Sequence, residues 1–212
     1  MNAVIFDMDG VLIDTEKHLI ECWIQAAKIH GVSMKREEAY LLRSLTGAMA
    51  APMLHEMYGE EFDYWTVRET RKKLMEQRLA EYGIERKKGV VEALEMLKEK
   101  GLKVAIATAT DSERAKGYLK EVGILPYFDY VISANMVSIG KPMPDIYLYA
   151  CEKIGEKPED CYAVEDSPNG VLSAYRAGMK VIMVPDLTQP DPETKKRLYA
   201  KIDSLEDLYK FV

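Results

Sequence analysis

Cysteine and histidine are scarce in this chain, and neither is spaced for a metal or redox site. The sequence holds three of each: Cys22, Cys151, Cys161, His18, His30 and His55. The odd number of cysteines and the lack of a Cys-x-x-Cys pair argue against a disulfide framework. The histidines have none of the spacings found in zinc sites, so we treat them as surface or packing residues. We therefore expect a reduced, cytoplasmic protein.

Long apolar runs and an excess of positive charge are also missing. No apolar run approaches the roughly 20 residues that a membrane-spanning helix requires. The first residues lack a basic region and reach Asp7 too early for a signal peptide. With 29 Lys and Arg against 35 Asp and Glu, the formal net charge of -6 argues against nonspecific nucleic-acid binding. We expect neither a membrane nor a nucleic acid as partner.

The composition is typical of a globular protein, and the sequence pattern changes near residue 83. The 212 residues are 48% hydrophobic and 30% charged, enough for one large domain or two modest ones. Beyond Gly83, short apolar runs alternate with amphipathic stretches, which indicates βαβ units and a parallel sheet. Strands are predicted near 103–107, 130–133, 161–164 and 181–184, and a terminal helix over 204–211.

A further strand is predicted before residue 7. The run from Val4 to Phe6 is followed by Asp7, Asp9 and Gly10, a pattern typical of a buried strand that a turn closes. An ordinary Asp-Gly turn is the alternative. We place this strand in the same sheet because the chain offers it no other partner. Ligands of parallel sheets bind beyond the carboxyl ends of the strands, where Asp7 and Asp9 lie.

Residues 15–83 show helical patterns throughout, with helices predicted over about 16–30, 37–45, 50–58 and 64–82. We therefore predict an α/β fold in which residues 1–14 and 84–212 form a Rossmann-like core. Residues 15–83 would form an α-helical cap, inserted after the first strand on two connections that let it open and close.

Two features of this helical region bear on substrate binding. Arg43, Thr46 and His18 are candidates for facing a cleft, with packing or surface positions as the alternative. Residues 66–81 are dense in charge, and we interpret them as a solvated helix face with i, i+4 ion pairs rather than a binding surface.

Polar side chains follow the predicted strands at one edge of the sheet. Thr108 ends the strand at 103–107, Glu165 and Asp166 end the strand at 161–164, and Lys141 lies in a Gly-Lys-Pro loop between them. Taken singly, these could be a strand end, helix-capping acids and a surface lysine. Together with Asp7 and Asp9 they form a carboxylate cluster, which Lys141 and a hard divalent cation such as Mg2+ would neutralise.

Such a set suits phosphoryl transfer. An aspartate can attack phosphorus to form an aspartyl-phosphate, and a carboxylic acid two residues on can protonate the leaving oxygen and then activate water. The cation, the lysine and hydroxyl or backbone donors would hold the phosphate oxygens and offset their charge.

The motifs Asp7-Met8-Asp9-Gly10-Val11, Thr108, Lys141-Pro142 and Glu165-Asp166 occur in this order. On them the chain resembles the haloacid dehalogenase superfamily, in the subgroup with a helical cap after the first strand, over nearly its whole length. The resemblance implies that Asp7 is the nucleophile and Asp9 the acid/base. It implies Mg2+ bound by Asp7, the Asp9 carbonyl and Asp166, with Glu165 at or next to the metal. It also implies that Thr108, the Ala109 amide and Lys141 bind the phosphate of a small phosphorylated substrate.

Within this superfamily the chain is similar to β-phosphoglucomutase-like phosphatases, which implies hydrolysis of a sugar phosphate or similar metabolite by a monomer. A sugar phosphomutase is the alternative. The chain departs from true β-phosphoglucomutases in having Leu19 in place of a histidine, and Gly47-Ala48-Met49-Ala50 without their arginine. Asp9 disfavours dehalogenases and phosphonatases, which resemble this motif without the acid. A third hypothesis is a binding protein that kept the fold and lost catalysis.

Overall fold

The strands form one parallel sheet with β1 at its centre. In the computed structural model, which describes residues 1–212, the strand order is β3-β2-β1-β4-β5-β6. The strands are β1 Ala3–Phe6, β2 Lys103–Thr108, β3 Tyr130–Ser133, β4 Cys161–Glu165, β5 Lys180–Met183 and β6 Ala200–Lys201. Phe6 lies opposite Ile106 of β2 and Val164 of β4. This is the strand order of a Rossmann-type sheet. Successive strands are added on one side of β1 up to β3 and on its other side from β4 onward. The predicted α/β fold class is confirmed.

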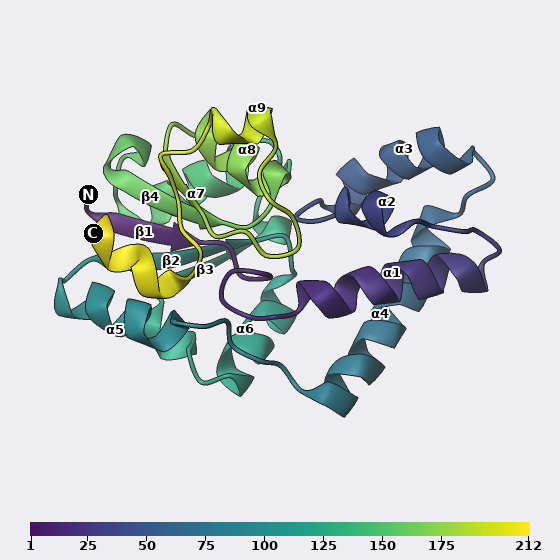
Figure 1. The fold of residues 1–212 in the computed structure, drawn as a ribbon, viewed down its shortest axis with the longest axis horizontal. Helices are drawn as coiled ribbons and strands as arrows, with labels where there is room; N and C mark the ends of the chain where they lie inside the picture. The colour runs from purple at the N-terminus through teal and green to yellow at the C-terminus, as the bar shows by residue number, and fades with distance from the viewer.

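Helices cover both faces of the sheet (Figure 1). They are α5 Val90–Glu99, α6 Ser112–Glu121, α7 Asp145–Ile154, α8 Pro168–Arg176 and α9 Pro192–Lys195, with short 3-10 turns at Leu125–Tyr127, Ala134–Met136, Pro158–Asp160 and Leu205–Lys210. Val4 and Phe6 of β1 belong to one hydrophobic core, with residues of α5 and α6. Ala3 and Ile5 belong to the other, with residues of α7 and α8. Burial on both faces is why β1 has no polar alternation.

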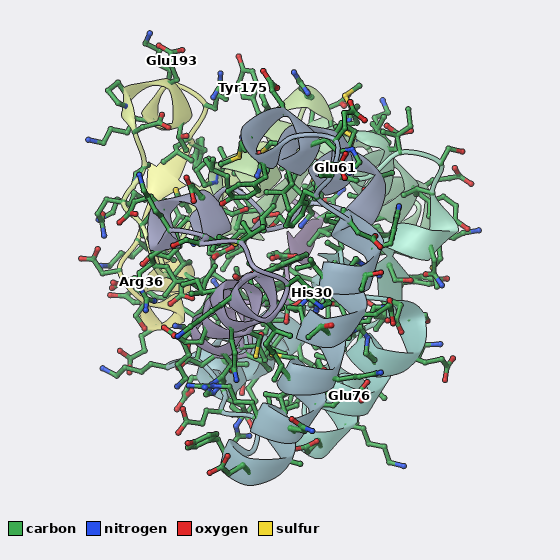
Figure 2. The ribbon with its side chains drawn as sticks, turned by 90° about the vertical axis from the view of Figure 1, so that its right-hand side faces the viewer. His30, Arg36, Glu61, Glu76, Tyr175 and Glu193 are labelled. Carbon is green, nitrogen blue, oxygen red and sulfur yellow. The ribbon has the colours of Figure 1, made fainter.

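Four helices follow β1 and lie together beyond one end of the sheet (Figure 1). They are α1 Glu16–Ile29, α2 Arg36–Tyr40, α3 Gly47–Tyr58 and α4 Tyr64–Tyr82, here called the α1–α4 segment. This segment has its own hydrophobic cluster, which includes Trp23, Leu54 and Val67. In Figure 2, which shows α1 nearly end-on, His30 lies against α4, and its Nε2 is 2.8 Å from Thr70 Oγ1. The four helices therefore pack on one another as well as on the sheet end.

The two connections between the α1–α4 segment and the sheet run side by side. The Asp14 N–H donates to the Glu85 carbonyl at 2.8 Å, and the Lys87 N–H donates to the Leu12 carbonyl at 3.0 Å. The Lys87 ammonium also binds Asp14 at 3.2 Å and Asp186 at 2.7 Å. Both connections are thus fastened to one another at the sheet end.

Several predicted element bounds are wrong. The helix predicted over 37–45 ends at Tyr40, and Ser44 has a φ of 60°, a left-handed conformation that no helix continues through. The helix predicted from residue 50 begins at Gly47. The predicted terminal helix is a 3-10 turn, and the two-residue β6 is too short to show a period in the sequence. None of the helices has both the length and the apolar composition needed to cross a bilayer.

Candidate active site

The carboxylate of Asp7 lies buried beyond the end of β1, where Lys141 holds it. The Asp7 N–H donates to the Val164 carbonyl at 2.9 Å, so Asp7 continues the sheet by one position. Lys141 Nζ donates to Asp7 Oδ1 at 2.8 Å and to Glu165 Oε1 at 2.6 Å. Tyr147 of α7 donates to the same Glu165 oxygen at 2.6 Å. One buried lysine thus joins the ends of β1 and β4 through two carboxylates.

Burial dominates the electrostatics of this group. It raises the pKa of Asp7 to about 7, against the attraction of Lys141 and with added repulsion from Glu165. Burial lowers the pKa of Lys141, but the carboxylates of Asp7 and Glu165 outweigh it and hold that pKa above its ordinary value. The lysine is therefore charged at neutral pH, and a further cation near Asp7 would favour the ionised form of its carboxylate.

Gly170, in the first turn of α8, leaves the space that Glu165 occupies. A Cβ at Gly170 would lie 2.0 Å from Glu165 Cδ. Ser167 begins α8, and its hydroxyl accepts from the Gly170 N–H at 3.0 Å, which fixes the helix start beside the carboxylate. The backbone of Gly170 has an ordinary helical conformation. The close contact with Glu165, and not the backbone conformation, is therefore what requires a glycine here.

We expect Gly170→Ala to destabilise the protein, by about 1–3 kcal/mol, because the new methyl group overlaps the Glu165 carboxylate. Gly117→Ala is the matched control, since Gly117 lies in the interior of α6 and its Cβ would meet no atom within 4 Å. There the same change should stabilise by roughly 0.5–1 kcal/mol, the usual gain of alanine over glycine in a helix. Urea unfolding measures both, and shifts of the same sign in the two variants would contradict the expectation.

Asp9 faces the same site and is held by hydroxyl groups. Thr15 Oγ1 donates to Asp9 Oδ1 at 2.5 Å, and Thr110 Oγ1 donates to Asp9 Oδ2 at 2.8 Å. Thr15 is the N-cap residue of α1, a position where a threonine hydroxyl often accepts a hydrogen bond from the helix backbone. Here it makes no such bond, because its hydroxyl is bound to Asp9. Both carboxylate oxygens of Asp9 are therefore oriented by the protein.

The end of β2 supplies the predicted phosphate-binding residues. Thr108 is fully buried, and its hydroxyl accepts from the Thr110 N–H at 3.0 Å and lies 3.5 Å from Asp9 Oδ2. Ala109 and Thr110 line the cavity above Asp7. Thr108 thus supports the backbone at the end of β2, while Ala109 and Thr110 are accessible to a ligand in the cavity.

Asp7, Glu165 and Asp166 form a buried acidic cluster, in which one oxygen from each residue lies within 4.8 Å of the others. Asp166 Oδ1 is buried without a hydrogen-bond partner. Burial raises the pKa of Asp166 well above its ordinary value, although Arg43 opposes this. Gly10, with a φ of 84°, is the residue that lets the loop approach, because a Cβ there would lie 2.5 Å from Asp166 Oδ2. Carboxylates from three residues, one of which has an unpartnered oxygen, fit a hard divalent cation.

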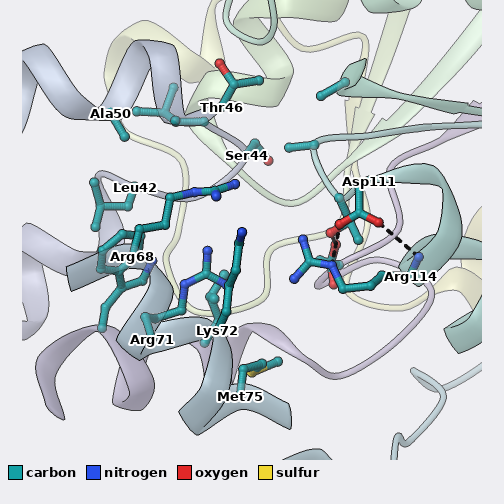
Figure 3. Close-up of a pocket in the computed structure, with 18 of the residues that line it drawn as sticks. Leu42, Ser44, Thr46, Ala50, Arg68, Arg71, Lys72, Met75, Asp111 and Arg114 are labelled. Carbon is teal, nitrogen blue, oxygen red and sulfur yellow. Dashed lines mark hydrogen bonds and ion pairs between the residues drawn. The ribbon is translucent and has the colours of Figure 1, made fainter. Parts of the chain in front are cut away.

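A cavity of about 400 Å3 lies above these residues, within the size range of small-molecule sites. Asp7, Asp9, Ala109 and Thr110 form its sheet side, and residues of α1, α3 and α4 close it from the other. Figure 3 shows Arg68, Arg71 and Lys72 of α4 pointing into it, opposite the ion pair between Arg114 and Asp111. The interpretation of residues 66–81 as a solvated face is therefore wrong for three basic residues. Their i, i+3, i+4 spacing, which puts them on one helix face, was the available signal.

The three residues proposed to face the cleft differ in position. Thr46 lines the cavity, and its Cγ2 fills the place of a Gly140 Cβ, at 2.2 Å. Arg43 is buried and donates to Asp166 Oδ2 at 3.2 Å and to Thr188 at 2.6 Å. His18 is not a cavity residue: it accepts from Arg78 Nε at 2.9 Å and stacks on Tyr82.

Glu16 is a buried acid whose place at the site was not predicted from the sequence. It lies at the cavity with Oε2 unpartnered, and burial together with the nearby Asp166 raises its pKa well above the ordinary value. Its position directly after the linker residue Thr15 was the only signal available. Tyr147 and Thr110 were also missed, since single hydroxyl groups have no pattern of their own.

Comparison with known proteins agrees with this geometry. Residues 4–184 match the family model described as haloacid dehalogenase-like hydrolase. The phosphorylated carbohydrates phosphatase of Thermotoga maritima is 35% identical, over 86% of this chain and 84% of that protein. Hexitol phosphatase A of Escherichia coli is 33% identical, over 85% and 81%.

A solved structure has the same fold. The structure of a putative β-phosphoglucomutase from Bacteroides vulgatus aligns with a TM-score of 0.84 over 99% of this chain and 86% of that one, at 27% identity. The sequence resemblance is thus confirmed by the family match, by the relatives and by the fold. The chain belongs to the haloacid dehalogenase-like hydrolase family, as a phosphatase of its β-phosphoglucomutase-like group.

Proposed function

We propose that this protein is a Mg2+-dependent phosphatase that hydrolyses a small phosphomonoester, a sugar phosphate or similar metabolite, through an aspartyl-phosphate on Asp7. The observation that carries this proposal is the arrangement of Asp7 and Asp9, two oriented carboxylates on the sheet side of one cavity. The relatives named for phosphorylated carbohydrates and hexitol phosphates support the substrate class.

The first step uses both aspartates. Lys141 holds Asp7 Oδ1, and the other carboxylate oxygen, Oδ2, attacks phosphorus. Asp9, oriented by Thr15 and Thr110, gives its proton to the leaving alcohol oxygen as the bond from phosphorus to that oxygen breaks.

Hydrolysis of the intermediate reverses the role of Asp9. As a carboxylate it takes a proton from water, whose oxygen attacks phosphorus and releases inorganic phosphate from Asp7. The Ala109 amide, with Lys141 and the hydroxyl of Thr108 behind it, supports the phosphate oxygens at the end of β2.

The acidic cluster would hold the Mg2+. Asp7 and Asp166 would bind it through side chains and Asp9 through its carbonyl. Glu165 is bound by Lys141 and Tyr147, so it would lie beside the metal and hold the lysine in position. When bound, the cation offsets the charge of the transferring phosphate.

We also propose that residues 15–83 act as a cap domain on a core of residues 1–14 and 84–212. The separate hydrophobic cluster of the α1–α4 segment supports this division. So do the paired connections at Asp14 and Glu85, which form a single place at which the two parts can hinge.

Phosphate release from a panel of sugar phosphates, nucleotides and an aryl phosphate tests the function. We expect turnover with Mg2+ and a loss of at least about 100-fold with EDTA, restored by added Mg2+. Equal rates with and without chelator would contradict the metal requirement. Formation of glucose 6-phosphate from β-glucose 1-phosphate without net phosphate release would identify a mutase instead.

A further inference from the structure

The cavity wall formed by α4 carries three cationic side chains. Arg68, Arg71 and Lys72 all line the cavity, and their charged ends point toward one another from the same helix (Figure 3). The fourth cation of the cavity, Arg114, is on the opposite side and is paired with Asp111. Like charges repel at close range, so the group on α4 is electrostatically unfavourable unless an anion lies between them.

Arg71 forms no ion pair with any carboxylate of the protein. The residue is more than nine-tenths buried, and its Nε has no hydrogen-bond partner. Burial, followed by repulsion from Arg68 and Arg114, lowers the pKa of Arg71 to about 10. The exposed Glu69 carboxylate feels the charge of Arg71 but forms its ion pairs with Lys72 and Arg68 instead. Its guanidinium group lies over the ring of Trp23, with 5.0 Å between the guanidinium carbon and the ring centre. A buried charge without a counter-charge is costly, and functional sites are where such a cost is retained.

The neighbouring cations are only partly satisfied. Lys72 binds Glu69 at 2.5 Å, but Glu69 is more than half exposed, and Arg68 lies 3.6 Å from that same carboxylate. One exposed carboxylate thus serves two cations at the cavity rim. In the proposed mechanism the transferred phosphate is bound by Lys141 and the end of β2, on the sheet side of the cavity. It is therefore not the anion that would neutralise the positive charge on α4.

We infer that Arg71, with Arg68 and Lys72, binds a second anionic group of the substrate, a carboxylate or a second phosphate distant from the phosphate that is cleaved. This inference rests on the proposed phosphatase function and narrows its substrate class to phosphomonoesters with a second negative charge. A planar guanidinium pairs with either anion through two parallel N–H donors, and a cavity of about 400 Å3 holds both ends of a small sugar derivative.

Three related compounds test the inference: glucose 6-phosphate, 6-phosphogluconate with an added carboxylate, and glucose 1,6-bisphosphate with an added phosphate. The quantity compared is the ratio of kcat/KM for each doubly anionic compound to kcat/KM for glucose 6-phosphate. We expect a ratio above 1 in the wild type for at least one compound, and the better of the two identifies the anion. Arg71→Met should reduce that ratio on the order of 10- to 100-fold.

A matched pair on α4 supplies the control. Lys72→Gln should lower the ratio, whereas Lys73→Gln, the same change at an exposed neighbour outside the cavity, should not. An identical ratio in Arg71→Met and wild type would overturn the inference. So would a lower Tm of ligand-free Arg71→Met with an unchanged ratio, because Arg71 would then only pack against Trp23.

A binding readout separates this inference from the proposed function. In Asp7→Asn, the doubly anionic compound should raise Tm more than glucose 6-phosphate does, and Arg71→Met should remove the difference. If the wild type hydrolyses none of the compounds but this difference is present, the phosphatase proposal fails and the anion site stands. Equal Tm shifts for both compounds would overturn the anion site, whatever the turnover.

Discussion

Asp7→Asn is expected to lower phosphate release on the order of 10^4-fold or more, because an amide oxygen does not form the phosphoryl bond that a carboxylate forms. Its Oδ1 can still accept from Lys141, so the variant should fold. Initial rates on the best substrate measure the loss. Mass spectrometry after acid quench should find a phosphoryl group on Asp7 in the wild type and none in the variant.

Asp203→Asn controls for the substitution itself. Asp203 is largely exposed and pairs only with Lys201, so its amide should leave the rate unchanged. If Asp7→Asn kept its rate while remaining folded, the nucleophile would have to be another group, and the proposed mechanism would be wrong.

Lys141→Met is expected to have the largest effect on stability, about 3–5 kcal/mol at neutral pH. The lysine side chain is fully buried between Asp7 and Glu165, and methionine leaves both carboxylates without their counter-charge. Chemical unfolding measures the loss. Lys196→Met is the control, since Lys196 is an exposed residue paired with Glu193, and such pairs contribute little.

The loss in Lys141→Met should also depend on pH. The pKa of Asp7 is already raised to about 7, and removing the lysine raises it further. A carboxyl whose pKa is higher in the folded state binds more protons there than in the unfolded chain, so its contribution to stability falls as pH rises. We therefore expect a smaller deficit at pH 5 than at pH 8. A deficit that grows on acidification would contradict this account.

The sheet could be predicted because its strands are buried on both faces, which produces apolar runs such as Val4 to Phe6 that differ from helical patterns. The helix bounds around Ser44 could not, since a single left-handed residue has no sequence period and the flanking Leu41, Leu42 and Leu45 are compatible with a helix. The division at residues 15 and 83 stays a prediction.

The grouping of Asp7, Lys141 and Glu165 could be predicted from the order of strands and loops along the chain, because parallel strands end at a common edge of the sheet. It could not reveal contacts between the helical region and that edge, such as Arg43 with Asp166, which depend on how helices pack. The high charge density of residues 66–81 led to a wrong prediction for Arg71, since composition does not distinguish a helix face in solvent from one that faces the protein interior.

The separate hydrophobic cluster of the α1–α4 segment has an evolutionary consequence. In our proposal, the residues that bind the part of the substrate distant from the cleaved phosphate are on α4, while Asp7 and Lys141 bind one another at the end of the sheet. Substitutions at Arg68 or Lys72 can therefore alter which metabolite is accepted without disturbing the groups that break the phosphate ester. Such independence lets one ancestral scaffold give rise to many enzymes, each differing along a single helix face.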